Sequence, residues 1–136
     1  MTSQRIATGL SILLALGLAF FGVQKFGAEN IVFETLASRS GISLFEPGVR
    51  IATGIAEIGT ALLLLLPRTR LFGALAAVGI VGGAIVFHLS PWLGINVPTI
   101  GHGLFFTAIV LFVLSVLNLW IQWAFSRSPN TEQEHA

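Results

Sequence analysis

The segment GVRIATGIAEIGTALLLLL, residues 48–66, decides the fold because it has the length of a membrane span and carries an acidic residue, Glu57, near its middle. As a helix it would cover roughly 28 Å, close to the ~30 Å hydrocarbon core of a bilayer. A charged residue at the centre of such a helix costs about 2.5–3.5 kcal/mol on insertion scales. Glu57 should therefore face other helices, and the rest of the chain should supply a partner for it.

The composition extends this interpretation to the whole chain. Of its 136 residues, 54% are hydrophobic and only 10% are charged, whereas a soluble domain has about 25% charged residues. The formal net charge of +1 predicts no nucleic-acid partner. The chain has no cysteine and no aspartate, which excludes disulfides, thiolate metal sites and a Ser-His-Asp triad. The partner that the composition indicates is the lipid bilayer.

Four apolar segments reach spanning length: Ile6–Phe26, Val49–Leu66, Leu71–Leu89 and Thr99–Ala124. Backbone groups in lipid must bond within their own segment, so each is predicted to be a helix. The turns LLPRTRLF and LSPWLGINVP separate the last three segments. The sequence thus predicts an all-α bundle of four transmembrane helices in one domain, residues 1–126. A disordered cytoplasmic tail is expected at residues 127–136.

The connection between the first two spans contains a short helical pattern, ENIVFETLASRSG. Asn30 lies near its start and Gly41 follows its end, in the positions that such residues prefer. Its apolar residues predict a short interfacial helix. This helix would lie either on the membrane as a spacer or over the mouth of the bundle as a lid.

Basic residues predict a multi-pass protein of the cell membrane with both termini in the cytoplasm. One side of the predicted membrane holds four arginines: Arg5, Arg68, Arg70 and Arg127. The other side holds three basic residues mixed with glutamates, and its loop at residues 90–98 has no Lys or Arg. Because cytoplasmic loops carry the excess of basic residues, the four arginines should be inside.

Polar side chains from every helix gather in the outer half of the predicted bundle. They are Lys25, Arg50, Glu57, His88 and His102. We predict that they form a ligand-binding site in which Glu57 pairs with Lys25, Arg50 or both. A buried ion pair seldom adds net stability over an apolar substitute, which favours a functional role for it. The alternative is a purely structural bridge, with the lysine and the arginine as interfacial anchors.

Small residues should bring the second and third helices together. The residues three, four or seven positions from Glu57 are small or polar, and this face should point into the bundle. The third helix offers a matching surface that includes a Gly79-x-x-x-Gly83 spacing.

The two histidines raise the question of a cofactor. Two imidazoles at similar depth could ligate a haem, but only if both rings face inward on one side. Haem is therefore disfavoured, and no metal site is predicted. His88 and His102 are expected either to hydrogen-bond a ligand or to lie at the interface without a special role.

Two stretches resemble DoxX-type membrane proteins. LGLAFFGVQKF, residues 16–26, is similar to the first helix of that family, which ends in a lysine. GIAEIGTALLLLLPRTRLFGALAAVGIVGGAIVFH, residues 54–88, is similar to its second and third helices. The family pattern is matched by Gly54 with Glu57, by a basic turn at Arg68 and Arg70, and by His88. The resemblance covers about residues 16–89.

The resemblance implies a four-helix integral membrane protein with a polar site at Lys25, Glu57 and His88. The family is named after a small subunit linked to quinone-dependent thiosulfate oxidation. We therefore expect an accessory subunit of a quinone-linked redox system, with quinone as its ligand and membrane redox subunits or a second copy of the chain as partners. Because some relatives look like assembly factors, the alternative is a non-enzymatic protein that binds or transports a small molecule or lipid, or assists membrane-protein assembly. No catalytic signature assigns an enzyme class.

Overall fold

The computed structural model describes residues 2–127, and in this range the chain is entirely helical apart from its turns. The elements are α1 (Thr2–Gln24), α2 (Ile31–Ser40), the 3₁₀ turn η1 (Ser43–Phe45), α3 (Gly48–Leu65), α4 (Arg70–Leu89) and α5 (Gly103–Arg127). The all-α prediction with four long helices and one short helix is confirmed. The tail expected to be disordered, from residue 128 onward, lies outside the described residues.

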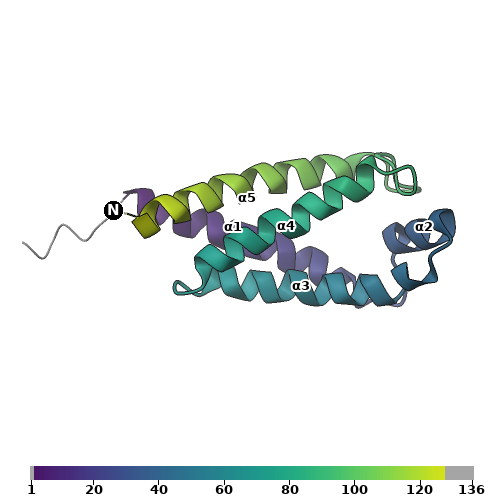
Figure 1. The fold of residues 1–136 in the computed structure, drawn as a ribbon, viewed down its shortest axis with the longest axis horizontal. Helices are drawn as coiled ribbons and strands as arrows, with labels where there is room; N and C mark the ends of the chain where they lie inside the picture. Colours follow the sequence, from purple (N-terminus) through teal and green to yellow (C-terminus); the bar gives the residue numbers. More distant parts are fainter. Residues whose placement is uncertain (1, 128–136) are drawn as a thin grey trace, which may run out of the picture.

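The four long helices form an up-down-up-down bundle. α1 packs on α3, α3 on α4 and α4 on α5, and α5 returns beside α1 (Figure 1). We call the end with the start of α1 and the end of α5 the terminal end. The opposite end, with α2 and the loop at residues 90–102, is called the distal end.

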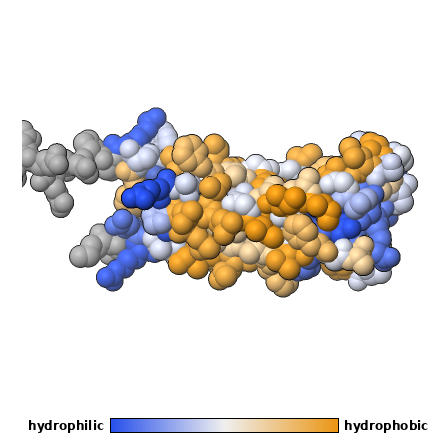
Figure 2. Space-filling model, turned by 90° about the horizontal axis from the view of Figure 1, so that it is seen from below, coloured by the Kyte–Doolittle hydropathy of each residue, from blue (hydrophilic) through white to orange (hydrophobic). Residues whose placement is uncertain are grey.

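The surface of the bundle is that of a membrane protein. Four helices of the described chain are long and apolar enough to cross a membrane. The face seen in Figure 2 is apolar across its middle, which we call the apolar belt, and has polar residues at both ends. Only 17% of the apolar stretch of α5 is buried, so most of its large side chains face outward. Because soluble proteins rarely expose so large an apolar surface to water, the chain is a multi-pass membrane protein in contact with lipid.

The terminal half of the bundle is solidly packed. Its core consists of Leu14, Leu18, Leu64, Ala77 and Val81, together with smaller neighbours. The turn between α3 and α4 is tight because residue 73 is glycine. A Cβ atom at that position would lie 2.7 Å from a backbone nitrogen of α3. Here the small residues predicted on α4 do allow close helix packing.

A short helix covers the distal end. Asn30 caps α2 by accepting a hydrogen bond from the backbone of Val32 at 3.2 Å, and Gly41 ends the helix with φ 74°. Leu36 is buried against Leu93 of the loop at residues 90–102. The guanidinium of Arg39 donates to the backbone oxygen of Leu93 at 3.2 Å. Of the two arrangements expected for this helix, the structure shows the lid.

The last helix begins later than the sequence predicted. We expected it from Thr99, but α5 starts at Gly103. The backbones of Val97 and Gly101 bond to each other in a tight turn. In this turn Thr99 and Gly101 have φ values of 67° and 77°, which no right-handed helix can accommodate. The expected start was therefore wrong by four residues.

Candidate ligand-binding site

Two glycines bring α1 and α3 into direct contact. A Cβ atom on Gly22 would lie 2.9 Å from the side chain of Ile58 and 3.2 Å from the Cβ atom of Glu57. A Cβ atom on Gly54 would lie 3.0 Å from the Cβ atom of Lys25. These gaps are too small for a larger residue. The close approach therefore sets Lys25 and Glu57 opposite each other.

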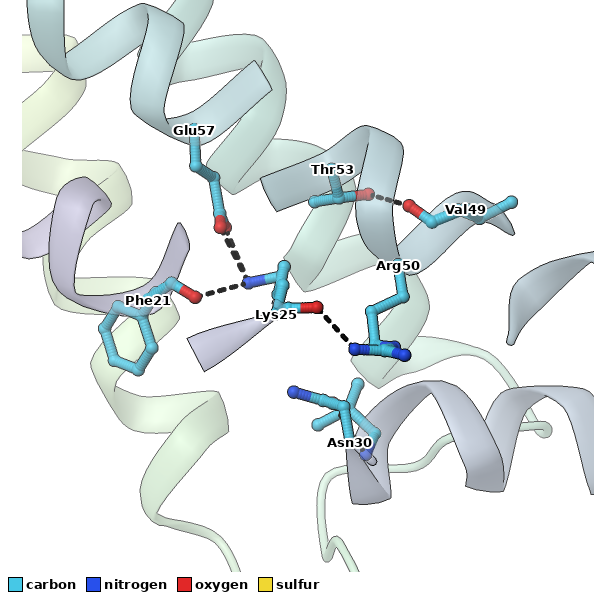
Figure 3. Close-up of polar contacts among 8 residues, drawn as sticks. Phe21, Lys25, Asn30, Val49, Arg50, Thr53 and Glu57 are labelled. Carbon is cyan, nitrogen blue, oxygen red and sulfur yellow. Dashed lines mark hydrogen bonds and ion pairs between the residues drawn. The ribbon is translucent and has the colours of Figure 1, made fainter. Parts of the chain in front are cut away.

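Lys25 and Glu57 form a buried ion pair. The Nζ atom of Lys25 lies 2.9 Å from Oε1 and 2.7 Å from Oε2 of Glu57 (Figure 3). The same ammonium donates to the backbone oxygen of Phe21 at 3.3 Å. The side chains of Lys25 and Glu57 are only 12% and 9% exposed. The partner sought for Glu57 is therefore Lys25, which neutralises the carboxylate within the bundle.

Arg50, the other cation considered for Glu57, bonds different groups. Its guanidinium donates to the backbone oxygen of Lys25, and also to that of Gly27 at 2.7 Å. Its Nε atom donates to Oε1 of Glu46 at 2.7 Å. Arg50 thus holds the carbonyl end of α1, where a cation is favoured by the helix dipole. It neither bonds Glu57 nor lines the cavity described next.

A cavity of about 750 Å³ lies in the distal half of the bundle. It is bounded by α1, α3, α4 and α5 and covered by α2, and most of its wall is apolar. Lys25, Glu57 and His88 all line it. The cavity is not sealed: its lining residues Ala56 of α3 and Gly79 of α4 are exposed where these two helices diverge from their turn (Figure 1). Gln24 of α1 and Thr107 of α5, which also line it, are exposed too.

Small residues on α4 create this space. Gly79 and Gly83 both line the cavity, and a Cβ atom on either would meet nothing within 4 Å. The Gly79-x-x-x-Gly83 spacing was expected to receive a neighbouring helix. That expectation is wrong for these two positions, because α3 and α4 have already separated at this depth.

The two histidines do not share the site. His88 is buried in the wall, where its Nδ1 atom lies 3.0 Å from the backbone oxygen of Gly94 and its ring contacts that of Phe105 edge to face. His102 is exposed in the turn before α5 and does not line the cavity. No group of three or more potential metal ligands occurs between residues 2 and 127.

The cavity has further lining residues, most of which the sequence placed near it. Ile31, Val32 and Leu36 of α2 close the distal side of the cavity, and Thr53 and Thr107 add hydroxyl groups to its wall. The apolar residues of α2 predicted its position over the bundle, and Thr53 lies four residues before Glu57 on the face expected to point inward. Thr107 was missed, because nothing in the local pattern distinguishes it from other threonines that bond their own helix.

Comparison with models of protein families, with curated proteins and with solved structures found no match to this chain. The cavity and its side chains are therefore the basis for proposing a function.

Proposed function

We propose that this chain is a DoxX-like membrane protein whose cavity binds a lipophilic small molecule of the quinone class for a membrane redox partner. One observation carries the proposal: an open cavity of about 750 Å³ among the spanning helices has an apolar wall interrupted by Lys25, Glu57 and His88. Sites for small organic molecules are typically about 300–1,000 Å³, mostly apolar, with a few convergent polar groups.

The opening between α3 and α4 indicates where a ligand comes from. Both helices are candidate membrane spans, so a gap between them faces lipid rather than water. A molecule dissolved in the bilayer can enter there without crossing a polar surface. Its ring would reach the polar wall while an apolar tail remains in lipid, a division that fits quinones and their reduced forms.

The polar side chains supply binding rather than electrons. Glu57 and His88 can hydrogen-bond the head group of such a ligand, and Lys25 holds the carboxylate of Glu57 in place. Phe105 lies edge to face with the imidazole of His88. The redox centre would be contributed by partner subunits. The chain then acts as a holder that presents the ligand to them.

We further propose that both termini are cytoplasmic and that the distal end faces outward. Arg5, Arg68, Arg70 and Arg127 all lie at the terminal end of the bundle. Basic residues at the distal end are instead accompanied by glutamates, as in the pairs Lys25–Glu57 and Arg50–Glu46. This asymmetry follows the positive-inside rule.

The test is to purify the full chain in a mild detergent and identify bound molecules by extraction and mass spectrometry. Gly83→Leu fills the cavity without removing a polar group, because its Cβ atom would enter open space. Gly9→Leu is the matched control on the outer surface of α1, where a Cβ atom also meets nothing. We expect quinones with the wild type and with Gly9→Leu but not with Gly83→Leu. Equal quinone content in all three proteins would reject the proposal.

One observation also favours the second candidate, a protein that binds lipid. The opening between α3 and α4 would accept an acyl chain as readily as a quinone tail. In the same experiment, a phospholipid retained by the wild type and lost from Gly83→Leu, with no quinone present, would identify this function instead.

A further inference from the structure

The polar atoms in the cavity wall differ in the hydrogen bonds that they can still make. A buried polar group that a ligand leaves unpaired costs binding free energy, so these remaining bonds decide which head group is accepted. The hydrogen bonds that each group already makes within the protein decide which bonds remain for a ligand.

His88 offers an acceptor. Its Nδ1 atom bonds the backbone oxygen of Gly94 at 3.0 Å, and a carbonyl oxygen can only accept. The proton of the neutral imidazole is therefore on Nδ1, which leaves a lone pair on Nε2. Within residues 2–127 Nε2 has no hydrogen-bond partner, so it is the ring atom available to a ligand.

The ion pair also has only acceptor capacity left. Lys25 has three N–H bonds, and its Nζ atom has three acceptors: Oε1 and Oε2 of Glu57 and the backbone oxygen of Phe21. All three N–H bonds of the ammonium are thus directed to acceptors within the protein. The two carboxylate oxygens have about four lone-pair sites between them, so Glu57 can still accept from a ligand.

The hydroxyl groups in the wall follow the same pattern. Thr53 donates its hydrogen to the backbone oxygen of Val49 at 2.8 Å, and Thr107 donates to that of Gly103 at 2.8 Å. Each hydroxyl oxygen keeps lone pairs but has no hydrogen left. Among the side chains of the described wall, the amides of Gln24, at the end of α1, and Asn30, at the start of α2, are the donors that remain.

We infer that the cavity selects lipophilic molecules whose head group donates hydrogen bonds, such as phenols and hydroquinones, over molecules whose head can only accept. The inference rests on the proposed function and refines it: the reduced, hydroxyl-bearing form of a quinone would be the preferred ligand. Its oxidised form presents carbonyl oxygens to a wall that has few donors to give.

The experiment compares two probes that differ by one donor, 4-nonylphenol and its methyl ether, 4-nonylanisole. Binding to the full chain in detergent is measured by calorimetry at pH 8, where an ordinary imidazole is uncharged. We expect the phenol to bind at least about tenfold more tightly than the ether. Gly83→Leu should abolish binding of both probes, and Gly9→Leu should change neither.

The outcomes separate the inference from the function on which it rests. If the ether binds as well as the phenol and Gly83→Leu abolishes both, the cavity is a site but the preference for donors is wrong. If Gly83→Leu leaves both affinities unchanged, the proposed function itself fails. His88→Phe keeps a ring beside Phe105 and removes Nε2. In this variant the affinity for the phenol should exceed that for the ether by less than about threefold. If a folded His88→Phe protein keeps the wild-type preference for the phenol, the assignment to Nε2 is wrong.

Discussion

Lys25 and Glu57 are charged side chains in a part of the molecule that disfavours charge. Both side chains are nearly buried within a bundle surrounded by lipid, and each is tolerable only because the other is there. The two residues occupy different positions in their helices: Lys25 follows the last residue of α1, whereas Glu57 is near the middle of α3. At the distal end α3 therefore extends beyond α1, and α2 lies at this end of the bundle.

Removing one partner of this pair should destabilise the protein strongly. Lys25→Met leaves the carboxylate of Glu57 without its counter-ion, and we expect a loss of about 3 kcal/mol in the free energy of unfolding. The double variant Lys25→Met/Glu57→Leu removes both charges and should regain most of that loss. Unfolding in mixed SDS micelles, followed by far-UV circular dichroism, measures both. A double variant no more stable than the single one would contradict this account.

Arg50 should resist replacement even by lysine. Its guanidinium bonds Glu46 and two backbone oxygens at once, which the single ammonium of a lysine cannot reproduce. We expect Arg50→Lys to lower the free energy of unfolding by about 1–3 kcal/mol, and Arg50→Met by more. Because Arg50 lies outside the cavity, the stoichiometry of bound ligand should be unchanged at temperatures where the variant is folded. Loss of ligand from a fully folded Arg50→Lys protein would show that it belongs to the site.

The sequence predicted that Glu57 needs a cationic partner but left Lys25 and Arg50 as alternatives. Spacing along α3 places Arg50 on the same face as Glu57, and both are buried there. Which cation meets the carboxylate depends instead on how α1 slides along α3. That register is set by the contact at Gly22 and Gly54, which is a property of two helices and cannot be derived from the period of one.

At the scale of elements, the contact between α1 and α3 gives a paired test. Gly54→Ala would place a Cβ atom 3.0–3.1 Å from Lys25, from the backbone of Gly22 and from the ring of Phe26. Gly59→Ala, in the same helix, would meet nothing within 4 Å. We expect the first to cost about 1–3 kcal/mol in free energy of unfolding and the second to be neutral or slightly stabilising. Equal effects of the two would show that α1 and α3 are less closely packed than described.

The lid formed by α2 depends on a small apolar cluster. Leu36 is fully buried against Leu93 and Val97, and Arg39 adds one hydrogen bond to the loop. Leu36→Ala should cost about 2–5 kcal/mol of this packing. Because α2 is held by this cluster at the edge of the bundle and not within the main core, the effect should be local opening. Hydrogen exchange of the backbone amides of residues 31–40 should become faster, while the amides of α1 and α5 stay protected. Uniformly faster exchange would contradict an independent lid.

The predicted helices were accurate because hydrophobic length and polar turns are local signals. The cavity was not predictable in the same way. Gly73 and Gly79 are both glycines on the same apolar helix, yet α3 packs against the first and leaves open space at the second. A sequence shows that a helix face is small, but it does not show whether a neighbouring helix fills that face. The missed start of α5 has a similar origin, because the turn at residues 97–101 depends on unusual backbone angles.

At the scale of the whole molecule, the bundle is divided along its length. The terminal half is a filled core, in which Oγ of Ser11 on α1 lies 3.1 Å from Oδ1 of Asn118 on α5. The distal half is hollow, holds the ion pair and is closed by α2. α3 and α4 pack closely at the terminal end, where Gly73 meets α3, and separate toward the distal end, where the cavity lies.

The orientation of the chain decides on which side of the membrane the hollow half lies, and this orientation can be measured directly. The sequence has no cysteine, so a single introduced thiol has no background. Asn96→Cys places an exposed thiol at the distal end, and Ser3→Cys places one at the terminal end. On intact cells, a membrane-impermeant maleimide should label Asn96→Cys at once and Ser3→Cys only after permeabilisation, because the four arginines of the terminal end should keep it inside. The reverse pattern would place the hollow half on the cytoplasmic side, and a partner for the cavity would then have to be sought there.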